Sequence, residues 1–133
     1  MHSIGIIGHG AFGGFLETLA KRFLPSSVVR IYSKDRTPDG KRFFTLEEAC
    51  AAEAVVFAVP ISAYEDAIAA ALPYLAPTTV LVDISTVKMH TADVLRRLAA
   101  DRPYVVSHPM FGPESYAKSG NEVKGLRLVL CEH

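Results

Sequence analysis

A glycine-rich turn near the start of the chain constrains its fold more than any other feature. Residues 3–14 read SIGIIGHGAFGG. The apolar run at residues 4–7 is typical of a buried strand, and Gly8, Gly10 and Gly13 follow it with the spacing GxGxxG. Gly8 would permit a tight turn, Gly10 would let a pyrophosphate approach the backbone, and Gly13 would let a helix pack closely on the strand.

A helix is predicted directly after this turn. Its apolar positions recur at helical spacing and its charged positions lie on the opposite side; the apolar set is Phe12, Phe15, Leu16, Leu19 and Phe23, and the charged set is Glu17, Lys21 and Arg22. The first N–H groups, at Ala11 and Phe12, and the positive end of the helix dipole would face the pyrophosphate. The order of strand, glycines and helix predicts dinucleotide binding, and a purely structural turn is the alternative. His9, inside the motif, is predicted to be a variable position.

Composition excludes several classes of function. The chain has 133 residues, half of them apolar, which fits one soluble domain. Its 14 Lys and Arg balance 14 Asp and Glu, so no overall field favours nucleic acid or a membrane surface. The five histidines and two cysteines lack metal-ligand spacing, and Cys50 is expected in the core. No apolar run approaches the roughly 20 residues of a membrane span, and we expect no signal peptide and a cytoplasmic location.

The end of the second predicted strand, residues 28–32, bears on the choice of cofactor. In this type of fold, a carboxylate about 20 residues beyond the glycines selects NAD by accepting a hydrogen bond from the ribose. Here Ser33 occupies that position, followed by Lys34, Asp35 and Arg36. A small hydroxyl flanked by cations suits a 2′-phosphate, so we expect NADP. The alternatives are that Asp35 accepts from the ribose of NAD, or that the segment is a solvated turn.

Two helix starts are predicted from capping-box spacing. Thr45 and Glu48 would open a short helix that continues through Ala52, and Ser62 and Glu65 repeat the spacing before a longer helix.

The remaining elements alternate between strands and helices. This alternation, with short connections, predicts a single α/β domain with a doubly wound, mostly parallel sheet of the Rossmann type. The later strands are expected at residues 53–59, 80–84, 104–106 and 126–130, the last near an edge. Val59, Pro60 and Ser62 follow a strand at the sheet edge where such folds bind ligands, so we expect them to line the cofactor cleft. An ordinary connecting loop is the alternative.

A histidine that follows the fifth predicted strand is the candidate catalytic group. His108 lies in the segment Ser107–Ser115, a predicted loop whose prolines and glycine would fix its path. A histidine facing the cleft can accept a proton from a hydroxyl while the attached carbon loses hydride. Imidazole suits this role because its ordinary pKa is about 6.5. A histidine tied to backbone at a turn is the alternative.

Four segments together give the chain a family resemblance. GIIGHGAFG at 5–13, FAVPIS at 57–62, DISTVK at 83–88 and SHPMFGPES at 107–115 resemble the prephenate and arogenate dehydrogenases of tyrosine biosynthesis, with the plant-type arogenate enzymes most alike. The resemblance spans residues 4–130. It implies an oxidative decarboxylation with NADP or NAD, in which hydride leaves the ring carbon that bears the hydroxyl, carbon dioxide is lost, and the ring becomes aromatic.

The resemblance also implies roles for individual residues. His108 matches the histidine that hydrogen-bonds the substrate hydroxyl and accepts its proton. Thr86 stands where the family has a serine that orients this histidine, and Ser85 is the alternative. Glu114 matches an acidic residue that contributes to closing the site, and Lys88 is either a site cation or a solvated side chain.

A second domain is implied as well. Family members have a helical domain that supplies dimerisation and the arginine that holds the substrate carboxylate, and we expect that domain to be absent from these 133 residues. We therefore predict cofactor binding with little turnover of a small-molecule substrate. The other readings are a stand-alone NADP(H)-binding module and a different hydroxyacid or imine reductase; His108 with Pro109 and Glu114 disfavours the reductase.

Overall fold

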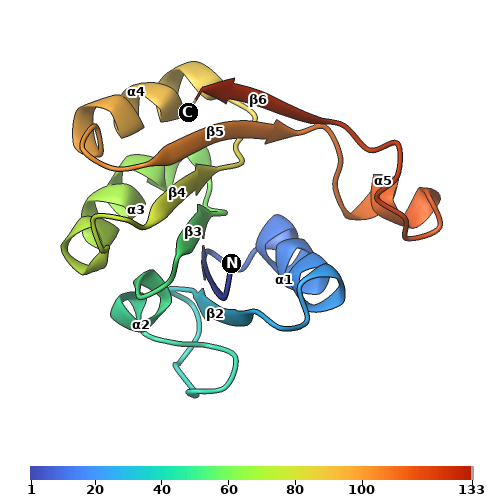
Figure 1. Ribbon diagram of the computed structural model, residues 1–133, viewed down its shortest axis with the longest axis horizontal. Helices are drawn as coiled ribbons and strands as arrows, with labels where there is room; N and C mark the ends of the chain where they lie inside the picture. The colour runs from blue at the N-terminus through green and yellow to red at the C-terminus, as the bar shows by residue number, and fades with distance from the viewer. Residues whose placement is uncertain (133) are drawn as a thin grey trace.

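Six strands form one sheet in the computed structural model, which describes residues 1–132 (Figure 1). Their order across the sheet is β2-β1-β3-β4-β5-β6, and the first five are parallel, while β6 runs antiparallel to β5 at one edge. The strands are β1 (Ser3–Ile7), β2 (Val28–Tyr32), β3 (Ala54–Phe57), β4 (Val80–Asp83), β5 (Tyr104–Pro109) and β6 (Leu128–Glu132). The prediction of a mostly parallel α/β sheet is confirmed.

Helices lie on both faces of this sheet. Figure 1 shows two helices on one side, α1 (Ala11–Phe23) and α5 (Pro113–Lys118), and three on the other, α2 (Leu46–Cys50), α3 (Tyr64–Ala71) and α4 (Lys88–Leu98). The chain moves outward from β1 to β2 and then returns past β1 to β3. Because parallel crossovers are right-handed, this reversal places α1 and the next three helices on opposite faces.

The core has one apolar layer on each face of the sheet. The larger layer packs side chains of β3, β4 and β5 against α2, α3 and α4, with Phe57, Leu81 and Leu95 almost fully buried. The smaller layer joins β1 and β2 to α1 and to Phe43, in the loop after β2. Burial of these side chains is the main force that fixes the sheet.

One predicted cap is confirmed and the other is wrong. The Thr45 side chain accepts from the Glu48 N–H at 3.2 Å and the Glu48 carboxylate accepts from the Thr45 N–H at 2.9 Å, although α2 ends at Cys50 rather than Ala52. Ser62 does not cap α3. It lies inside a 3₁₀ turn, Ile61–Ala63, which runs directly into α3, so the helix has no free start at Ser62.

The last two strands differ from the predicted ranges. Strand β5 continues to Pro109 instead of ending at residue 106, because β6 pairs with its second half. The predicted loop Ser107–Ser115 therefore begins within β5 and ends within α5. Likewise β6 is displaced by two residues from the predicted 126–130, and β3 and β4 are shorter than predicted at their ends.

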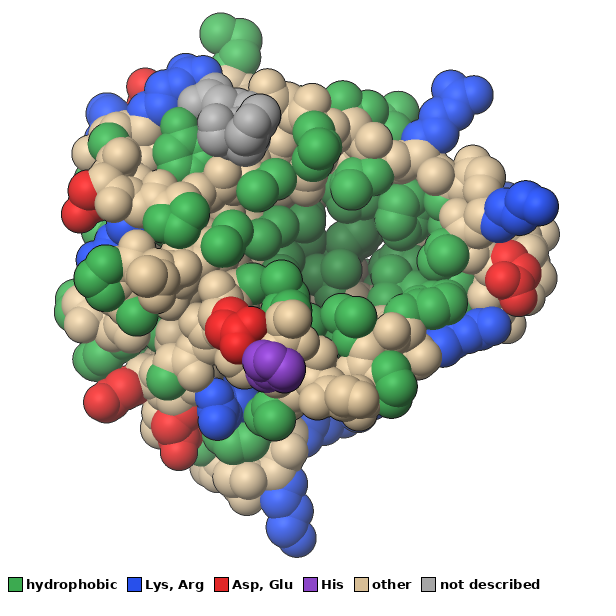
Figure 2. Space-filling model, in the orientation of Figure 1, with side chains coloured by type: hydrophobic (Ala, Val, Ile, Leu, Met, Phe, Trp, Pro, Cys, Tyr) green, Lys and Arg blue, Asp and Glu red, His purple; other side chains and the backbone are tan. Residues whose placement is uncertain are grey.

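An aromatic cluster holds α5 against α1. The ring of Phe15 lies 5.6 Å from Phe12, 6.2 Å from Phe111 and 5.4 Å from Tyr116. Figure 2 shows hydrophobic side chains lining a hollow between α1, α5 and the strands β5 and β6. The segment that follows His108 is thus packed back onto the first helix. Phe23, predicted on the apolar face, is instead 43% exposed because it lies at the end of α1.

Three further facts bear on the class of protein. No helix within residues 1–132 is long and apolar enough to cross a membrane. Within the same residues, no group of three His, Cys, Asp or Glu side chains is placed to hold a metal ion. Cys50 and Cys131 are free thiols, and Cys50 is buried as expected, which raises the pKa of its thiol to about 11.

Candidate functional site

A cleft of about 1050 Å³ opens at the carboxyl ends of strands β1 to β4. It lies where the strand order reverses, between β1 and β3, which is the position at which open α/β sheets bind ligands. Most of the residues predicted to bind cofactor line it: Gly8, Gly10, Ala11, Phe12, Ser33, Lys34, Val59, Pro60 and Ser62. Gly13 and Arg36 do not line it.

The three motif glycines have different surroundings. Gly8 has a positive φ of 101°, and a Cβ there would lie 2.4 Å from the Ala58 carbonyl oxygen. A Cβ on Gly13 would lie 2.3 Å from the Gly8 carbonyl oxygen, so α1 packs as closely as predicted. At Gly10 a Cβ would meet no atom within 4 Å. The fold therefore requires Gly8 and Gly13, whereas the space beside Gly10 is open to a ligand.

The N-terminus of α1 faces the cleft, and no side chain caps it or neutralises the positive end of its dipole. Gly10 is the N-cap, no side chain caps the helix, and its first turn contains no acidic residue. The first N–H groups of an α-helix have no acceptor within the helix, and together with the dipole they favour an anion. The open space at Gly10 and these unpaired donors fit the pyrophosphate of a dinucleotide.

The second half of the cleft is formed after β2. Ser33, Lys34 and Asp35 line it, so both a 2′-phosphate partner and a ribose acceptor are within the same segment. The guanidinium carbon of Arg36 lies 5.6 Å above the ring of Phe43, outside the cleft lining. Arg36 is thus held at the rim by a cation–π contact.

A buried carboxylate joins this segment to the glycine turn. Glu17 is 3% exposed, although it was predicted on the outer side of α1. It lies on the same helical face as Gly13 and Ala20, both buried, and these small residues leave room for it. Its oxygens accept from Arg42 Nε at 2.9 Å and Nη2 at 2.8 Å, and from Lys21 Nζ at 2.6 Å. Three hydrogen bonds from positively charged donors offset the free-energy cost of burying the carboxylate.

His9, which the sequence predicts to be a variable position, completes this cluster. Its Nε2 lies 3.0 Å from Glu17 Oε2, and its ring meets the edge of Phe43 at 5.1 Å. Because a carboxylate only accepts hydrogen bonds, Nε2 of His9 must be the donor. The sequence signal that would have found the cluster is Glu17 between two small residues on the helical face that meets the sheet.

Acid is expected to weaken the fold through Glu17. Burial alone would raise its pKa, but hydrogen bonds from Arg42, Lys21 and His9 lower it from 4.5 to about 2. A lowered pKa contributes stability that is fully present above the unfolded value and is lost as pH falls towards the folded value. We expect a loss of about 3 kcal/mol between pH of about 5 and about 2 from this group.

The measurement is urea unfolding at several pH values for the unaltered chain and for Glu17→Gln. The variant should show a shallower decline in the free energy of unfolding below pH of about 5. Glu65→Gln, which removes a half-exposed surface carboxylate bonded to Arg97, is the control and should leave the decline unchanged. Parallel curves for Glu17→Gln and the unaltered chain would contradict this assignment.

A second buried carboxylate lies next to the cleft residues 84–87. Asp83, at the end of β4, is 0% exposed. Its Oδ1 accepts from the Ser85 backbone N–H at 3.1 Å and from the Ser85 hydroxyl. Its Oδ2 accepts from Lys88 Nζ at 2.6 Å and from the Thr91 hydroxyl at 2.9 Å. Every lone-pair direction of this carboxylate is thus used by the protein.

These contacts separate the three polar residues predicted near the reaction. Ser85 donates its hydroxyl proton to Asp83, so it has no proton left to donate elsewhere. Thr86 lines the cleft, is exposed, and has no hydrogen-bond partner among the described residues. Lys88 is not a freely solvated side chain, because its ammonium bridges Asp83 and the Ser107 carbonyl oxygen.

His108 and Glu114 lie outside the lining of the cleft. His108 is half-buried in β5, opposite Val129 of β6, and no described residue hydrogen-bonds its imidazole. Its neighbour Ser107 is tied to β4, since the Ser107 hydroxyl donates to the Asp83 carbonyl oxygen at 2.8 Å. Glu114 is exposed in the first turn of α5. The structure therefore brings Ser85 and Thr86 to the cleft and leaves His108 and Glu114 outside its lining.

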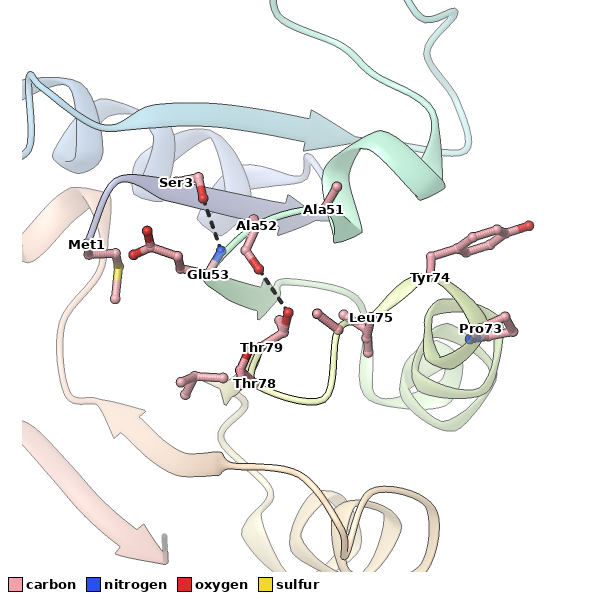
Figure 3. Close-up of a pocket in the computed structure, with 12 residues that line it drawn as sticks. Met1, Ser3, Ala51, Ala52, Glu53, Pro73, Tyr74, Leu75, Thr78 and Thr79 are labelled. Carbon is pink, nitrogen blue, oxygen red and sulfur yellow. Dashed lines mark hydrogen bonds between the residues drawn. The ribbon is translucent and has the colours of Figure 1, made fainter.

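A second hollow, of about 960 Å³, lies at the amino ends of β1, β3 and β4, opposite the end at which the cleft opens (Figure 3). Its polar groups bond to one another: the Glu53 N–H donates to the Ser3 hydroxyl at 3.0 Å, and the Thr79 hydroxyl donates to the Ala52 carbonyl at 2.9 Å. Figure 3 shows the Tyr74 ring directed away from these groups. Since ligand sites need convergent polar groups that remain available, the cleft beside Gly10 is the better candidate.

Comparison with protein families identifies the chain. Residues 40–127 match the model of the prephenate dehydrogenase nucleotide-binding domain. The chain belongs to this family. The matched residues include β3 to β5, Asp83 and His108, so the family assignment rests on a segment that begins well after the glycine turn. A comparison with functionally curated proteins gave no match.

Solved structures give the same fold. A Corynebacterium glutamicum protein assigned as a prephenate dehydrogenase is 28% identical, with a TM-score of 0.67 over 84% of this chain and 37% of its own. The arogenate dehydrogenase of Synechocystis is 21% identical, with a TM-score of 0.70 over 80% of this chain and 40% of its own.

A third structure was solved with ligands. Prephenate dehydrogenase from Aquifex aeolicus, in complex with hydroxyphenyl propionate and NAD⁺, is 16% identical, with a TM-score of 0.75 over 100% of this chain and 51% of its own. At the identities of the Synechocystis and Aquifex enzymes the likeness shows the fold alone. This chain spans between 37% and 51% of the length of these three proteins.

Proposed function

We propose that this domain binds a nicotinamide dinucleotide and supplies the catalytic histidine for the oxidative decarboxylation of prephenate or arogenate in tyrosine biosynthesis. The observation that carries the proposal is the open space at Gly10, beside an uncapped helix start, in a chain of the prephenate dehydrogenase family. Such a cofactor accepts the hydride that leaves the substrate. The substrate arginine and the dimer contacts would come from a second, helical domain.

The residues of this chain would divide the work between the cleft and the segment of β5 and α5 outside its lining. Gly10, Ala11 and Phe12 would hold the pyrophosphate with backbone N–H groups. Ser33 and Lys34, with Arg36 outside the lining, would bind around the adenosine ribose, and their cations favour NADP, while Asp35, which also lines the cleft, would serve NAD.

His108, which lies outside the cleft lining, would accept the proton of the ring hydroxyl. Its imidazole is free of hydrogen bonds from the described residues, which supports this role over a histidine fixed at a turn. Thr86 would donate a hydrogen bond that orients substrate or imidazole, because Ser85 is committed to Asp83. Glu114, on the exposed face of α5, would contribute to closing the site.

Gly10→Ala tests the proposed dinucleotide site without a change in the stability of the fold. Alanine is tolerated by the backbone of Gly10, whose φ is −80°, and its Cβ would meet no protein atom. The methyl group would occupy the space proposed for the pyrophosphate, so we expect affinity for NADPH and NADH to fall about 10- to 100-fold. Fluorescence titration with each nucleotide measures this effect, and the thermal unfolding midpoint should not move.

Gly112→Ala is the matched control, since a Cβ there also meets nothing within 4 Å but lies outside the cleft. It should leave both affinities unchanged. If Gly10→Ala binds as tightly as the unaltered chain, the pyrophosphate does not lie on this turn. Preference of the unaltered chain for NADH over NADPH would move the ribose contact to Asp35.

A further inference from the structure

The loop after β2 reaches the glycine turn through one side chain. Arg42 approaches both oxygens of the Glu17 carboxylate, with Nε at 2.9 Å and Nη2 at 2.8 Å. The side chain of Glu17 is 4% exposed and that of Arg42 is 50% exposed. A two-point contact between guanidinium and carboxylate fixes direction as well as distance. Arg42 is therefore held in one orientation by a buried anchor on α1.

Phe43 connects Arg42 to Arg36, which follows the segment proposed to bind the adenosine ribose. The ring of Phe43 is 9% exposed, with the His9 ring at 5.1 Å and the guanidinium carbon of Arg42 also at 5.1 Å. On the same ring, the guanidinium carbon of Arg36 lies at 5.6 Å. The position of Arg36 at the rim thus depends on a ring that Arg42 and His9 hold in place.

The loop backbone is fixed independently of the Arg42 side chain. One carboxylate oxygen of Asp39 accepts from the N–H groups of Lys41, Arg42 and Phe43 at 2.8 to 2.9 Å. The Phe44 N–H also donates to the Ile31 carbonyl of β2 at 2.8 Å. Loss of the Arg42 side chain should therefore leave the loop folded and remove only its link to the glycine turn.

We propose that Arg42 is a positioning residue for cofactor recognition, which holds Arg36 and the preceding segment Ser33–Asp35 against the glycine turn through Glu17 and Phe43. It makes no contact with the nucleotide itself. This inference rests on the proposed dinucleotide function and concerns the ribose end of that same cleft. Selectivity for a 2′-phosphate would then depend on a residue that stands outside the cleft lining.

Lys21 provides a matched control for Arg42. Both cations bond Glu17, but Lys21 lies on α1, the same helix as Glu17, and so does not link the loop to it. Arg42→Met and Lys21→Met each remove one positive charge from the same carboxylate. A difference in nucleotide affinity between these variants therefore reports the link between the loop after β2 and α1, rather than the loss of a positive charge beside Glu17.

The probes are 2′,5′-ADP and 5′-AMP, which carry the ribose end of the cofactor without nicotinamide. For Arg42→Met we expect affinity for 2′,5′-ADP to fall about tenfold while affinity for 5′-AMP changes less than about twofold. Lys21→Met should leave both affinities within about twofold of the unaltered chain. Arg42→Lys, which keeps a cation but loses the two-point contact, should give an intermediate ratio. Thermal unfolding of every variant checks that the fold is kept.

The possible outcomes separate this inference from the function on which it rests. Failure of the unaltered chain to bind NADPH, NADH or either fragment would overturn the proposed function. If the unaltered chain binds and Arg42→Met keeps the ratio of the two fragment affinities, Arg42 does not position the ribose end. Equal effects of Arg42→Met and Lys21→Met would also overturn the inference, because charge alone would then explain them.

Discussion

Replacement of Asp83 by alanine is expected to lower the free energy of unfolding by about 3 to 5 kcal/mol. Its carboxylate is fully buried and accepts hydrogen bonds from Ser85, Lys88 and Thr91. Without it, the Lys88 ammonium, whose side chain is 20% exposed, would remain inside the protein with no counter-charge. Urea unfolding followed by circular dichroism measures the loss.

Two further variants identify the cause of this loss of stability. Asp93→Ala removes an exposed carboxylate that pairs with Arg97 at 2.9 Å on the surface of α4, and it should cost less than about 1 kcal/mol. Adding Lys88→Met to Asp83→Ala should recover part of the stability, because no unpaired charge is then buried. A loss for Asp83→Ala no larger than that for Asp93→Ala would show that the cluster does not stabilise the junction of β4 and β5.

His108→Asn is expected to reduce turnover about 10²- to 10⁴-fold while cofactor affinity stays nearly constant. Asparagine keeps polarity and approximate size but cannot accept the substrate proton at neutral pH. Because His108 lies outside the lining of the nucleotide cleft, its loss should not disturb the bound dinucleotide. The assay follows cofactor reduction, with prephenate or arogenate, in a protein that joins this domain to the second half found in its relatives.

His90→Asn is the control for this measurement, since His90 is exposed on α4, is not among the cleft-lining residues and has no proposed role in the reaction. It should leave turnover unchanged. Equal turnover of His108→Asn and the unaltered protein would remove His108 from catalysis. A domain that binds nucleotide tightly in that case would be better described as a nucleotide-binding module.

Features set by local sequence were predicted correctly. The order of the strands and of α1 to α4 follows from apolar periodicity, although α5 was not predicted, and the start of α2 follows from the spacing of Thr45 and Glu48. The close packing at Gly8 and Gly13 was also predicted, because strand, turn and helix are adjacent in the chain.

Features that depend on distant segments were not predicted. Strand β5 is longer than its own apolar run because β6 pairs with Ser107–Pro109, and this pairing is invisible in either segment alone. The cluster at Glu17 was missed for the same reason, since Arg42 lies 25 residues further along the chain. Lys88 appeared ambiguous because its partner, the Ser107 carbonyl, is a backbone group on another strand.

The strand order has a consequence for how the chain acquires its structure during synthesis. After β1 and β2 have paired, β3 joins the free edge of β1, and each later strand from β4 to β6 joins the edge formed by the one before it. The sheet can therefore grow in one direction as the polypeptide leaves the ribosome, with no strand inserted between two that have already paired. The contacts of α5 with α1, which include the aromatic cluster and the hydrogen bond from Arg22 to the Tyr116 hydroxyl, reach back across about a hundred residues, so they are expected to form last.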